Sequence, residues 1–306
     1  MQGGERYNSI SDHLKSVFGH KTVKLSIDAG FTCPNRDGTL GTGGCAFCSG
    51  GGSGELAAHA SSASADYSGS ITEQIGRLSD KWPDACYLAY FQSFTNTYAP
   101  VEVLRERYYA ALNDPRISGI VIATRPDCLG EDVLDLLAEI NRSHFMWVEL
   151  GLQSVHDSTL AAMNTCYTSE TYDRAAKALN ERGIRVVTHL ILGLPGETKE
   201  MMLESVRHVC SSPVFGIKLH LMNIIKTAPL YETMPDYVPF ESMEEYVDLV
   251  VKCLEIIPPG VTIHRLTGDV PRRLLVSPEW SYRKRTILNA INRELAVRGT
   301  YQGAAL

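Results

Sequence analysis

Seven short apolar runs rich in β-branched residues alternate along this 306-residue chain with amphipathic segments of helical length. The runs occupy residues 23–27, 85–91, 119–123, 147–150, 186–192, 216–221 and 261–264. The amphipathic segments occupy residues 70–81, 101–112, 131–141, 169–182, 199–211 and 242–256. Strand and helix signals that alternate with short loops predict parallel β/α units.

Six or seven such units exceed a small Rossmann unit and favour an α/β fold of the partial (β/α)6 barrel type. A doubly wound open sheet is the main alternative. We expect an N-terminal segment at residues 1–20, the barrel at residues 21–268 and a basic helical C-terminal extension at residues 269–306. In a β/α barrel the chemistry takes place at the carboxyl ends of the strands, so residues that follow the apolar runs are the functional candidates.

The formal net charge of −6 is unevenly distributed. Residues 265–306 hold eight Lys/Arg and three Asp/Glu, a local charge of +5, which leaves −11 on the other 264 residues. A basic segment on an acidic body suits a polyanionic partner, and a solvated helix face gives the same pattern. The start of the chain is polar and no apolar run approaches the roughly 18 residues of a membrane span, so we expect a soluble, cytoplasmic protein with no membrane partner.

Three of the eight cysteines, Cys33, Cys45 and Cys48, lie on one glycine-rich loop after the first apolar run. A C-x2-C pair brings two thiolates to one metal or cluster, and no second pair completes a structural zinc site. Three thiolates leave one iron of a 4Fe–4S cluster free to bind a small molecule. On spacing alone, a cluster, a zinc ion and free thiols all stay open. Residues 50–69, rich in Gly, Ser and Ala, predict a flexible connector or a lid.

Several segments taken together carry a family resemblance. In chain order they read IDAGFTCPNRDGT, YFQSFTNTYAP, ATRPDCL, VELGLQS, LILGLPGET, KLHLMNIIKTAPL and HRLTGD. With C-x11-C-x2-C in place of the familiar C-x3-C-x2-C, they resemble the radical S-adenosylmethionine (SAM) superfamily, and within it a bacterial subgroup related to the catalytic subunit of Elongator. The resemblance covers nearly the whole chain. It implies a radical SAM enzyme with a 4Fe–4S cluster and SAM as cofactors, and a reducing electron donor such as flavodoxin or ferredoxin as partner.

The resemblance also assigns roles to residues that follow the predicted strands. Cys33, Cys45 and Cys48 would hold the cluster, and Phe47 would lie against the adenine of SAM. The other expected cofactor-binding residues are Gln92, Ser93, Thr95, Thr124, Arg125, Glu149, Gln153, Ser154, Gly193, Leu194 and Pro195. When bound, the cofactors would generate a 5′-deoxyadenosyl radical that takes a hydrogen atom from the substrate.

Some of these residues have simpler structural interpretations. Gln153 and Ser154 can cap a helix that begins near His156, and the segment GLPGET can be a turn that ends in an N-cap at Thr198. The chain also departs from its relatives after the fourth predicted strand. Relatives commonly continue with Asn-Arg-Gly-His, whose arginine can face the SAM carboxylate, whereas residues 164–168 here read NTCYT. Three explanations stay open: another cation, Arg125 or Arg174, replaces that arginine, SAM binding is weaker, or the activity differs from that of the relatives.

We expect Lys218 and His220 to be catalytic. They alternate on the sixth predicted strand, so both side chains point to one face of an otherwise apolar strand. A pair of hydrogen-bonded core residues is the structural alternative. The expected substrate-binding residues are Asn223, Lys226, His264, Arg265, Arg283, Lys284 and Arg285. Residues 281–285 (SYRKR) are expected to open the final helix, and their cations can grip phosphates.

Three functions follow from these features. The first is radical chemistry on a tRNA wobble uridine, in which a carboxymethylaminomethyl side chain is trimmed to the aminomethyl form; the kinship with Elongator and the basic segment favour it. The second is radical SAM chemistry on a small metabolite or peptide. The third is a non-catalytic metal or electron-transfer protein, which would keep a cluster without binding SAM.

Overall fold

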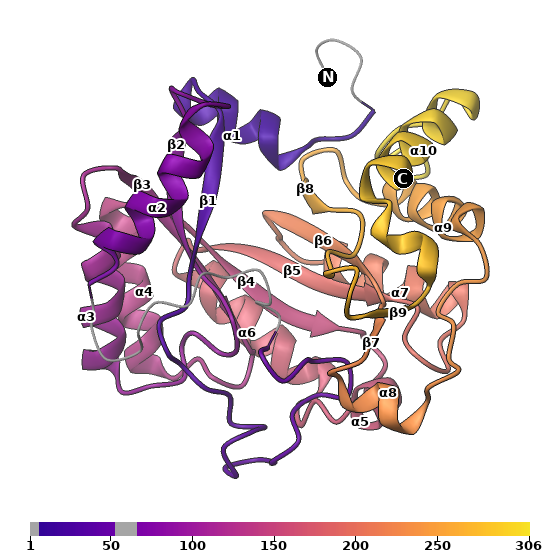
Figure 1. The fold of residues 1–306 in the computed structure, drawn as a ribbon, viewed down its shortest axis with the longest axis horizontal. Coiled ribbons are helices and arrows are strands. Elements are labelled where there is room, and N and C mark those ends of the chain that lie inside the picture. Colours follow the sequence, from indigo (N-terminus) through magenta and orange to yellow (C-terminus); the bar gives the residue numbers. More distant parts are fainter. Residues whose placement is uncertain (1–5, 53–65) are drawn as a thin grey trace.

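Seven parallel strands form one sheet in the computed structural model, which describes residues 6–52 and 66–306. The strands are β1 (Thr22–Ile27), β2 (Cys86–Phe91), β3 (Ile117–Thr124), β4 (Phe145–Gln153), β5 (Arg185–Leu192), β6 (Gly216–Leu221) and β8 (Thr262–Arg265). They lie side by side in chain order, and the sheet curls into a partial barrel (Figure 1). A doubly wound sheet would reverse its strand order at a switch point, so the predicted partial barrel is confirmed and the alternative is wrong.

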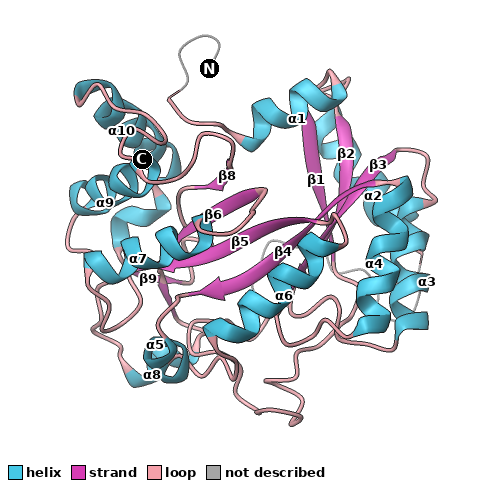
Figure 2. Ribbon diagram, turned by 180° about the vertical axis from the view of Figure 1, so that it is seen from behind, coloured by secondary structure: helices cyan, strands magenta, loops and turns pink. Residues whose placement is uncertain are grey.

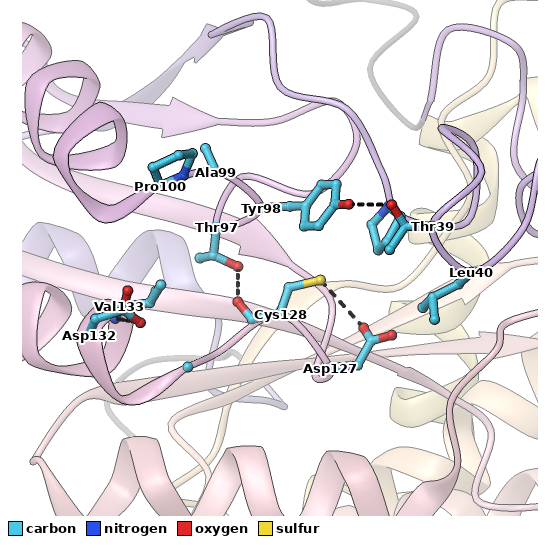
Figure 3. Close-up of a pocket in the computed structure, with 12 residues that line it drawn as sticks. Thr39, Leu40, Thr97, Tyr98, Ala99, Pro100, Asp127, Cys128, Asp132 and Val133 are labelled. Carbon is cyan, nitrogen blue, oxygen red and sulfur yellow. Dashed lines mark hydrogen bonds between the residues drawn. The ribbon is translucent and has the colours of Figure 1, made fainter.

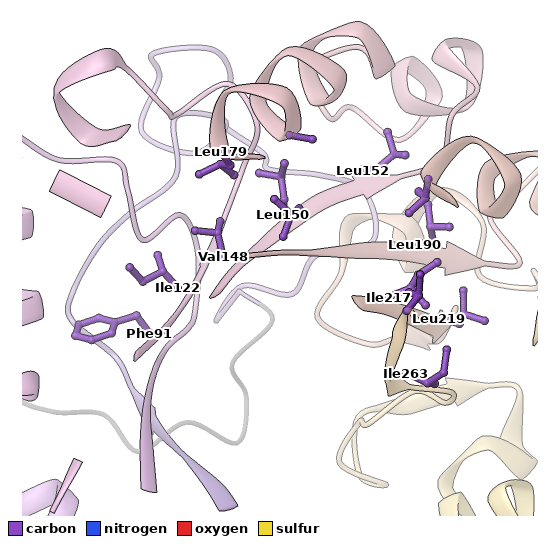
Figure 4. Packing of buried hydrophobic residues seen from close by; sticks show 14 of the residues in the cluster. Phe91, Ile122, Val148, Leu150, Leu152, Leu179, Leu190, Ile217, Leu219 and Ile263 are labelled. Carbon is purple, nitrogen blue, oxygen red and sulfur yellow. The ribbon is translucent and has the colours of Figure 1, made fainter. Parts of the chain in front are cut away.

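Helices cover the outer face of the sheet (Figure 2). They include α2 (Ser68–Ser79), α3 (Val101–Leu112), α4 (Glu131–Ser143), α6 (Ser169–Glu181), α7 (Lys199–Cys210) and α9 (Met243–Glu255). The short helices α5 (Asp157–Ala162) and α8 (Pro229–Thr233) lie beyond the carboxyl ends of the strands (Figure 1). The core lies between these layers, where Val148 and Leu150 of β4 belong to one buried cluster with Leu179 of α6 (Figure 4). The side chains between them on β4 therefore point to the barrel axis, because a strand alternates its faces.

Helix α1 (Ile10–Phe18) covers the amino-terminal end of the barrel. Its N-cap Ser9 pairs with Ile263 of β8, and the chain continues from the helix into β1, so α1 bridges the two edge strands of the sheet. Leu14 of α1 belongs to a buried cluster with Trp147 and Val187 that fills this end of the barrel. The interior is thus closed here and accessible from the carboxyl ends of the strands.

The C-terminal extension packs beside β6 and β8. Strands β7 (Ile224–Ile225) and β9 (Leu275–Ser277) form a separate antiparallel pair, followed by the 3-10 helix η1 (Glu279–Tyr282) and by α10 (Lys284–Val297). Helix α10 lies next to α9 (Figure 1). The prediction that residues 281–285 open the final helix is wrong for Ser281 and Tyr282, because Arg283 leaves helical geometry between η1 and α10.

Two predictions concern segments rather than side chains. Most of the connector or lid predicted at residues 50–69 lies outside the described residues, which break off between 52 and 66. Within the described ranges, no helix combines the length and apolar character needed to cross a membrane. The boundaries predicted near residues 20 and 268 stay predictions.

Candidate functional site

A central cavity of about 470 Å³ opens at the carboxyl ends of the strands, and every strand of the main sheet contributes to its wall. On β4, Glu149 and Gln153 line this cavity, whereas Val148 and Leu150 face the helices. The two-residue period of the strand produces this division. The cavity therefore lies where a β/α barrel carries its chemistry.

A second cavity, of about 640 Å³, lies between the cysteine loop and the loops that follow β2 and β3 (Figure 3). The polar side chains that line it already have hydrogen-bond or ion-pair partners in the protein. Asp127 pairs with Arg125, and Thr97 donates a hydrogen bond to the carbonyl of Cys128 at 2.5 Å. Burial and the adjoining Asp127 raise the pKa of the Cys128 thiol to about 12, so this thiol is a poor nucleophile. The central cavity is the candidate site.

The cysteine loop forms one wall of the central cavity. Cys33, Cys45 and Cys48 all line it. The buried side-chain amide of Asn35 lies 3.6 Å from Cys45 Sγ, and the guanidinium of Arg125 lies 3.9 Å from the same sulfur. Burial and the neighbouring Cys48 raise the pKa of the Cys45 thiol to about 12. Donors aimed at this sulfur favour the thiolate form that a metal requires.

The NTCYT segment after α5 holds the cysteine loop in position. Asn164 Nδ2 donates to the carbonyl of Gly44 at 2.8 Å, and Asn35 Nδ2 donates to the carbonyl of Asn164 at 2.5 Å. Cys166 Sγ donates to Asn35 Oδ1 at 3.2 Å. Asn164 and Cys166 have φ angles of 52° and 63°, in the left-handed region that non-glycine residues seldom adopt. Strained backbone of this kind concentrates at functional sites.

Arg125, one of the two cations expected to replace the missing arginine, lies beside the NTCYT segment. It makes two hydrogen bonds to Asp127, at 2.9 and 2.7 Å, and donates to the carbonyl of Thr165 at 2.8 Å. Burial opposes its charge, but Asp127 outweighs that effect and raises the pKa of Arg125 above its usual value. The guanidinium is therefore a fixed positive charge beside Cys45. Arg174, the other expected cation, lies exposed on α6 and does not line the cavity.

Glu149 organises the floor of the cavity. Its carboxylate is fully enclosed and has five polar neighbours. They are Lys24 Nζ at 3.1 Å, Tyr90 Oη at 2.6 Å, Trp147 Nε1 at 3.2 Å, His189 Nε2 at 3.1 Å and Lys218 Nζ, which forms an ion pair with it. A buried carboxylate needs such partners to stay charged.

The electrostatics of the floor keep Glu149 ionised and its histidines neutral. Burial raises the pKa of Glu149, but Lys218 and Lys24 outweigh burial and hold that pKa well below its usual value. Burial, helped by Lys218, lowers the pKa of His189 to about 4. Burial also holds the pKa of His220 well below its usual range. Both imidazoles are therefore uncharged near pH 7.

Two polar atoms on residues that line the cavity lack a partner within the described part of the protein. They are His220 Nε2 and Thr95 Oγ1, and both atoms are buried. A buried polar atom without a hydrogen bond costs about 1–3 kcal/mol. A ligand that supplies hydrogen-bonding groups would remove this cost.

The structure brings together most of the predicted site residues around this cavity. They are Cys33, Cys45, Phe47, Cys48, Gln92, Thr95, Thr124, Arg125, Glu149, Gln153, Lys218, His220, Asn223 and Arg265. Phe47 packs in a small apolar cluster with Leu194 and Met222, which fixes one wall. Residues from strands β3, β4, β6 and β8, and from the loops after β1, β2, β3 and β6, thus meet at one place.

Several predicted cofactor-binding residues lie outside the cavity wall. They are Ser93, Ser154, Gly193, Leu194 and Pro195. The Ser154 hydroxyl accepts a hydrogen bond at 3.1 Å from the backbone N–H of His156, just before α5, in line with the helix-start interpretation. Thr198 is the N-cap of α7. Leu194 is fully buried behind Phe47 and supports the wall from outside.

Some of the predicted substrate-binding residues line the cavity, and the others lie outside it. Asn223 and Arg265 line the cavity. His264 lies at the closed end of the barrel, where its ring is 5.4 Å from that of Trp147. The remaining four, Lys226, Arg283, Lys284 and Arg285, are exposed.

Sequence reasoning missed several residues of the cavity wall, chiefly Lys24, Tyr90, Tyr167 and His189. Lys24, Tyr90 and His189 occupy inward-facing positions on predicted strands. The alternation argument that selected Lys218 would have found them. Tyr167 lies in a loop, under the guanidinium of Arg125, and no periodic signal marks it.

Comparison with known proteins identifies the class. The family model described as the Radical SAM superfamily matches residues 37–209, and the model described as the Radical_SAM C-terminal domain matches residues 214–296. The chain therefore belongs to the radical SAM superfamily and is an enzyme of that class, which confirms the family and fold that the sequence resemblance implied.

Three relatives illustrate this. The chain is 46% identical over 300 residues to YtqA of Bacillus subtilis (strain 168), which covers 98% of this chain and 92% of YtqA. It is 27% identical over 166 residues to a tRNA uridine(34) acetyltransferase of Methanocaldococcus jannaschii. That alignment covers 53% of this chain and 30% of the acetyltransferase. The solved structure of Methanocaldococcus infernus Elp3 with an N-terminal deletion shares the fold, with a TM-score of 0.68 and 17% identity over 92% of this chain. This chain covers 64% of that one, less than two thirds of its length.

Membership in the superfamily implies an iron–sulfur cluster and SAM. No set of three or more His, Cys, Asp or Glu side chains in the described ranges has the geometry of a single-ion site. The three loop cysteines instead share one cavity wall, with two N–H donors close to one sulfur. Cysteines that bind a cluster are attached to separate irons, so the residues present fit this group.

Proposed function

We propose that this protein is a radical SAM enzyme that converts the carboxymethylaminomethyl side chain of a tRNA wobble uridine to the aminomethyl form. Cys33, Cys45 and Cys48 would hold the 4Fe–4S cluster, and Phe47, which lines the same cavity, would contact SAM. When bound, these groups supply a 5′-deoxyadenosyl radical that takes one hydrogen atom from the substrate. The observation that carries the proposal is the presence of a three-cysteine wall and a cationic floor in one cavity.

The rim of the cavity positions SAM. Arg125, fixed beside Cys45, is the counter-ion of the SAM carboxylate, in place of the arginine that relatives carry in the following loop. Thr95, whose buried hydroxyl lacks a partner among the described residues, offers a hydrogen bond. Gln92, Thr124 and Gln153 complete the polar wall.

An exposed aromatic group near the cavity supports RNA as the substrate. Tyr282 is 39% exposed, and the central carbons of the Arg272 and Arg283 guanidinium groups are 4.4 and 5.4 Å from the centroid of its ring. Aromatic rings flanked by arginines stack on bases and contact phosphates. Ser281, the neighbour of Tyr282, accepts a hydrogen bond at 2.8 Å from Asn223, which lines the cavity.

The relatives favour the same substrate class. One relative bears the name tRNA uridine(34) acetyltransferase, and it aligns with about half of this chain. The local charge of +5 in residues 265–306 also suits a polyanion. Together with the aromatic group at Tyr282, these features support tRNA rather than a free metabolite.

The conversion is an oxidative removal of a two-carbon unit. A C–H bond breaks at the carbon between the amine and the carboxylate, that carbon loses two electrons to give an imine, and water splits the C–N bond to release glyoxylate. One electron leaves with the abstracted hydrogen atom. The second passes to a one-electron carrier of the flavodoxin or ferredoxin class, and the remaining proton, from the amine, goes to water. His220 Nε2 would orient the amine by accepting a hydrogen bond from its N–H, because the ring is neutral and this atom has no partner among the described residues.

The test is turnover by the reconstituted enzyme under anaerobic conditions, with SAM, reduced flavodoxin and tRNA that carries carboxymethylaminomethyl uridine. We expect mass spectrometry of the digested tRNA to show aminomethyl uridine, with one 5′-deoxyadenosine formed per nucleoside converted. Unchanged tRNA together with SAM cleavage on a metabolite or peptide would assign the second predicted function. A protein that keeps its cluster but binds no SAM would be the third.

A further inference from the structure

The floor of the central cavity holds more basic side chains than carboxylates. Lys24 and Lys218 both contact the single carboxylate of Glu149. Burial holds the pKa of Lys218 well below its usual value, and His189 and His220 are neutral near pH 7, so the positive charge of the floor rests on Lys24 and the neighbouring Arg265. Lys218 is enclosed, with 3% of its side chain exposed, whereas 30% of the Lys24 side chain is exposed. Lys24 is therefore the floor lysine that can bind another partner.

Arg265 extends this positive field. It lies next to Lys218 where β8 pairs with β6, and it lines the same cavity. Its acidic neighbour Asp269 is 3.7 Å away and is shared with Lys284 at 2.8 Å, so the guanidinium is loosely paired. A ligand that fills the cavity takes these cations out of water, which is costly unless the ligand brings a negative charge.

Two anionic groups are expected in this cavity under the proposed function, the carboxylate of SAM and the carboxylate of the substrate. The cations that can pair with them lie in two separate places. The guanidinium of Arg125 lies 3.9 Å from Cys45 Sγ. Lys24 Nζ, at 3.1 Å, and Lys218 Nζ contact Glu149 instead. Arg125 thus belongs to the cysteine wall, where SAM binds under the proposed function, and the floor is left for the substrate.

We infer that the floor is a carboxylate-binding subsite, in which Lys24 Nζ forms an ion pair with the substrate carboxylate and Arg265 contributes a second one. His220 Nε2 faces the adjoining amine. That the carboxylate belongs to a tRNA nucleoside rests on the proposed function. That the ligand carries a carboxylate follows from the positive charge of the floor. The aminomethyl product carries a positive amine and no carboxylate, so the same floor repels it and favours its release.

The test compares probes that differ by one carboxylate. One pair consists of anticodon stem-loop RNAs with carboxymethylaminomethyl or aminomethyl uridine at the wobble position, and the other of N-benzylglycine and benzylamine. Affinities are measured by calorimetry on the reconstituted wild type, Lys24→Met, Lys24→Arg and Lys15→Met, the last a control whose lysine is exposed on α1. We expect the wild type, Lys24→Arg and Lys15→Met to prefer the carboxylate probe by about tenfold or more, and Lys24→Met to lose most of this preference and keep only the part that Arg265 contributes.

SAM affinity on the same variants identifies which carboxylate Lys24 binds, and we expect it to be unchanged. A Lys24→Met protein that keeps its preference, or that loses SAM affinity as strongly as probe affinity, would overturn the inference. If Lys24→Met is unfolded by circular dichroism, Arg265→Gln takes its place, and an undiminished preference there overturns the inference. The protein could prefer N-benzylglycine in a Lys24-dependent way and yet leave tRNA unchanged. That result would support the carboxylate subsite and contradict the proposed function.

Discussion

Lys218 Nζ and Glu149 Oε2 form an ion pair inside the barrel, where 3% and 0% of the two side chains are exposed. Removing one member leaves an uncompensated charge in a closed interior, whereas removing both does not. We expect Lys218→Met to reduce the free energy of unfolding by about 3–5 kcal/mol. We expect the double variant Lys218→Met/Glu149→Leu to lose less than the sum of the two single losses.

Urea denaturation at matched iron content measures these free energies. The control is Lys177→Met on α6, whose pair with Glu181 spans 3.8 Å and is 77% and 62% exposed. Exposed pairs of this kind contribute about 0–1 kcal/mol. If the double variant lost the full sum of the two single losses in free energy of unfolding, Lys218 and Glu149 would not be energetically coupled.

The stability of the protein should depend on pH through His189. Its pKa is about 4 in the folded chain, mainly through burial, against about 6.5 in an unfolded chain. Between these values the unfolded chain binds a proton that the folded chain does not, so this contribution is present above pH 6.5 and is lost as the pH falls toward 4. We expect the wild type to lose up to about 2 kcal/mol more than His189→Asn between pH 7 and pH 5. Parallel stability curves for the two proteins would show that His189 is not the group responsible.

Arg125→Lys should weaken SAM binding, because a lysine cannot reproduce the two-pronged contact with Asp127 that fixes the guanidinium beside Cys45. We expect the dissociation constant for SAM to rise about tenfold or more. Arg174→Lys on the exposed face of α6 is the matched control and should leave it unchanged. Equal effects from the two substitutions would remove Arg125 from its assigned role.

Cys45→Ala should abolish cluster binding and 5′-deoxyadenosine formation together. The reconstituted wild type should contain about four irons and four sulfides per chain. Cys128→Ala, which removes a thiol that lines the second cavity, should keep the full iron content. Zinc in the wild type without SAM cleavage would contradict the cluster assignment.

The arrangement of the strands was predictable because the strands are apolar, β-branched and separated by helices of ordinary length. All seven predicted runs appear as parallel neighbours in chain order. The alternation of Lys218 and His220 likewise predicted that both point into the barrel, where both line the cavity. These features depend on local periodicity, which a single sequence carries.

Other features depend on contacts between distant segments, which periodicity does not record. The closing role of α1 requires Ser9 to lie beside Ile263, far along the chain. The position of Arg125 at the NTCYT segment arises from a hydrogen bond to Thr165. Glu149 was predicted to contact SAM from its place on a strand, and only the fold reveals the two lysines around it.

The central claim is that this enzyme trims a carboxymethylaminomethyl uridine in tRNA. The most direct measurement is the nucleoside content of total tRNA, by mass spectrometry, from a wild-type strain and from a strain that lacks the gene. We predict that the deletion strain accumulates the carboxymethylaminomethyl nucleoside and loses the aminomethyl form. The wild-type gene should restore the pattern and Cys45→Ala should not. An identical nucleoside profile in the two strains would contradict the account.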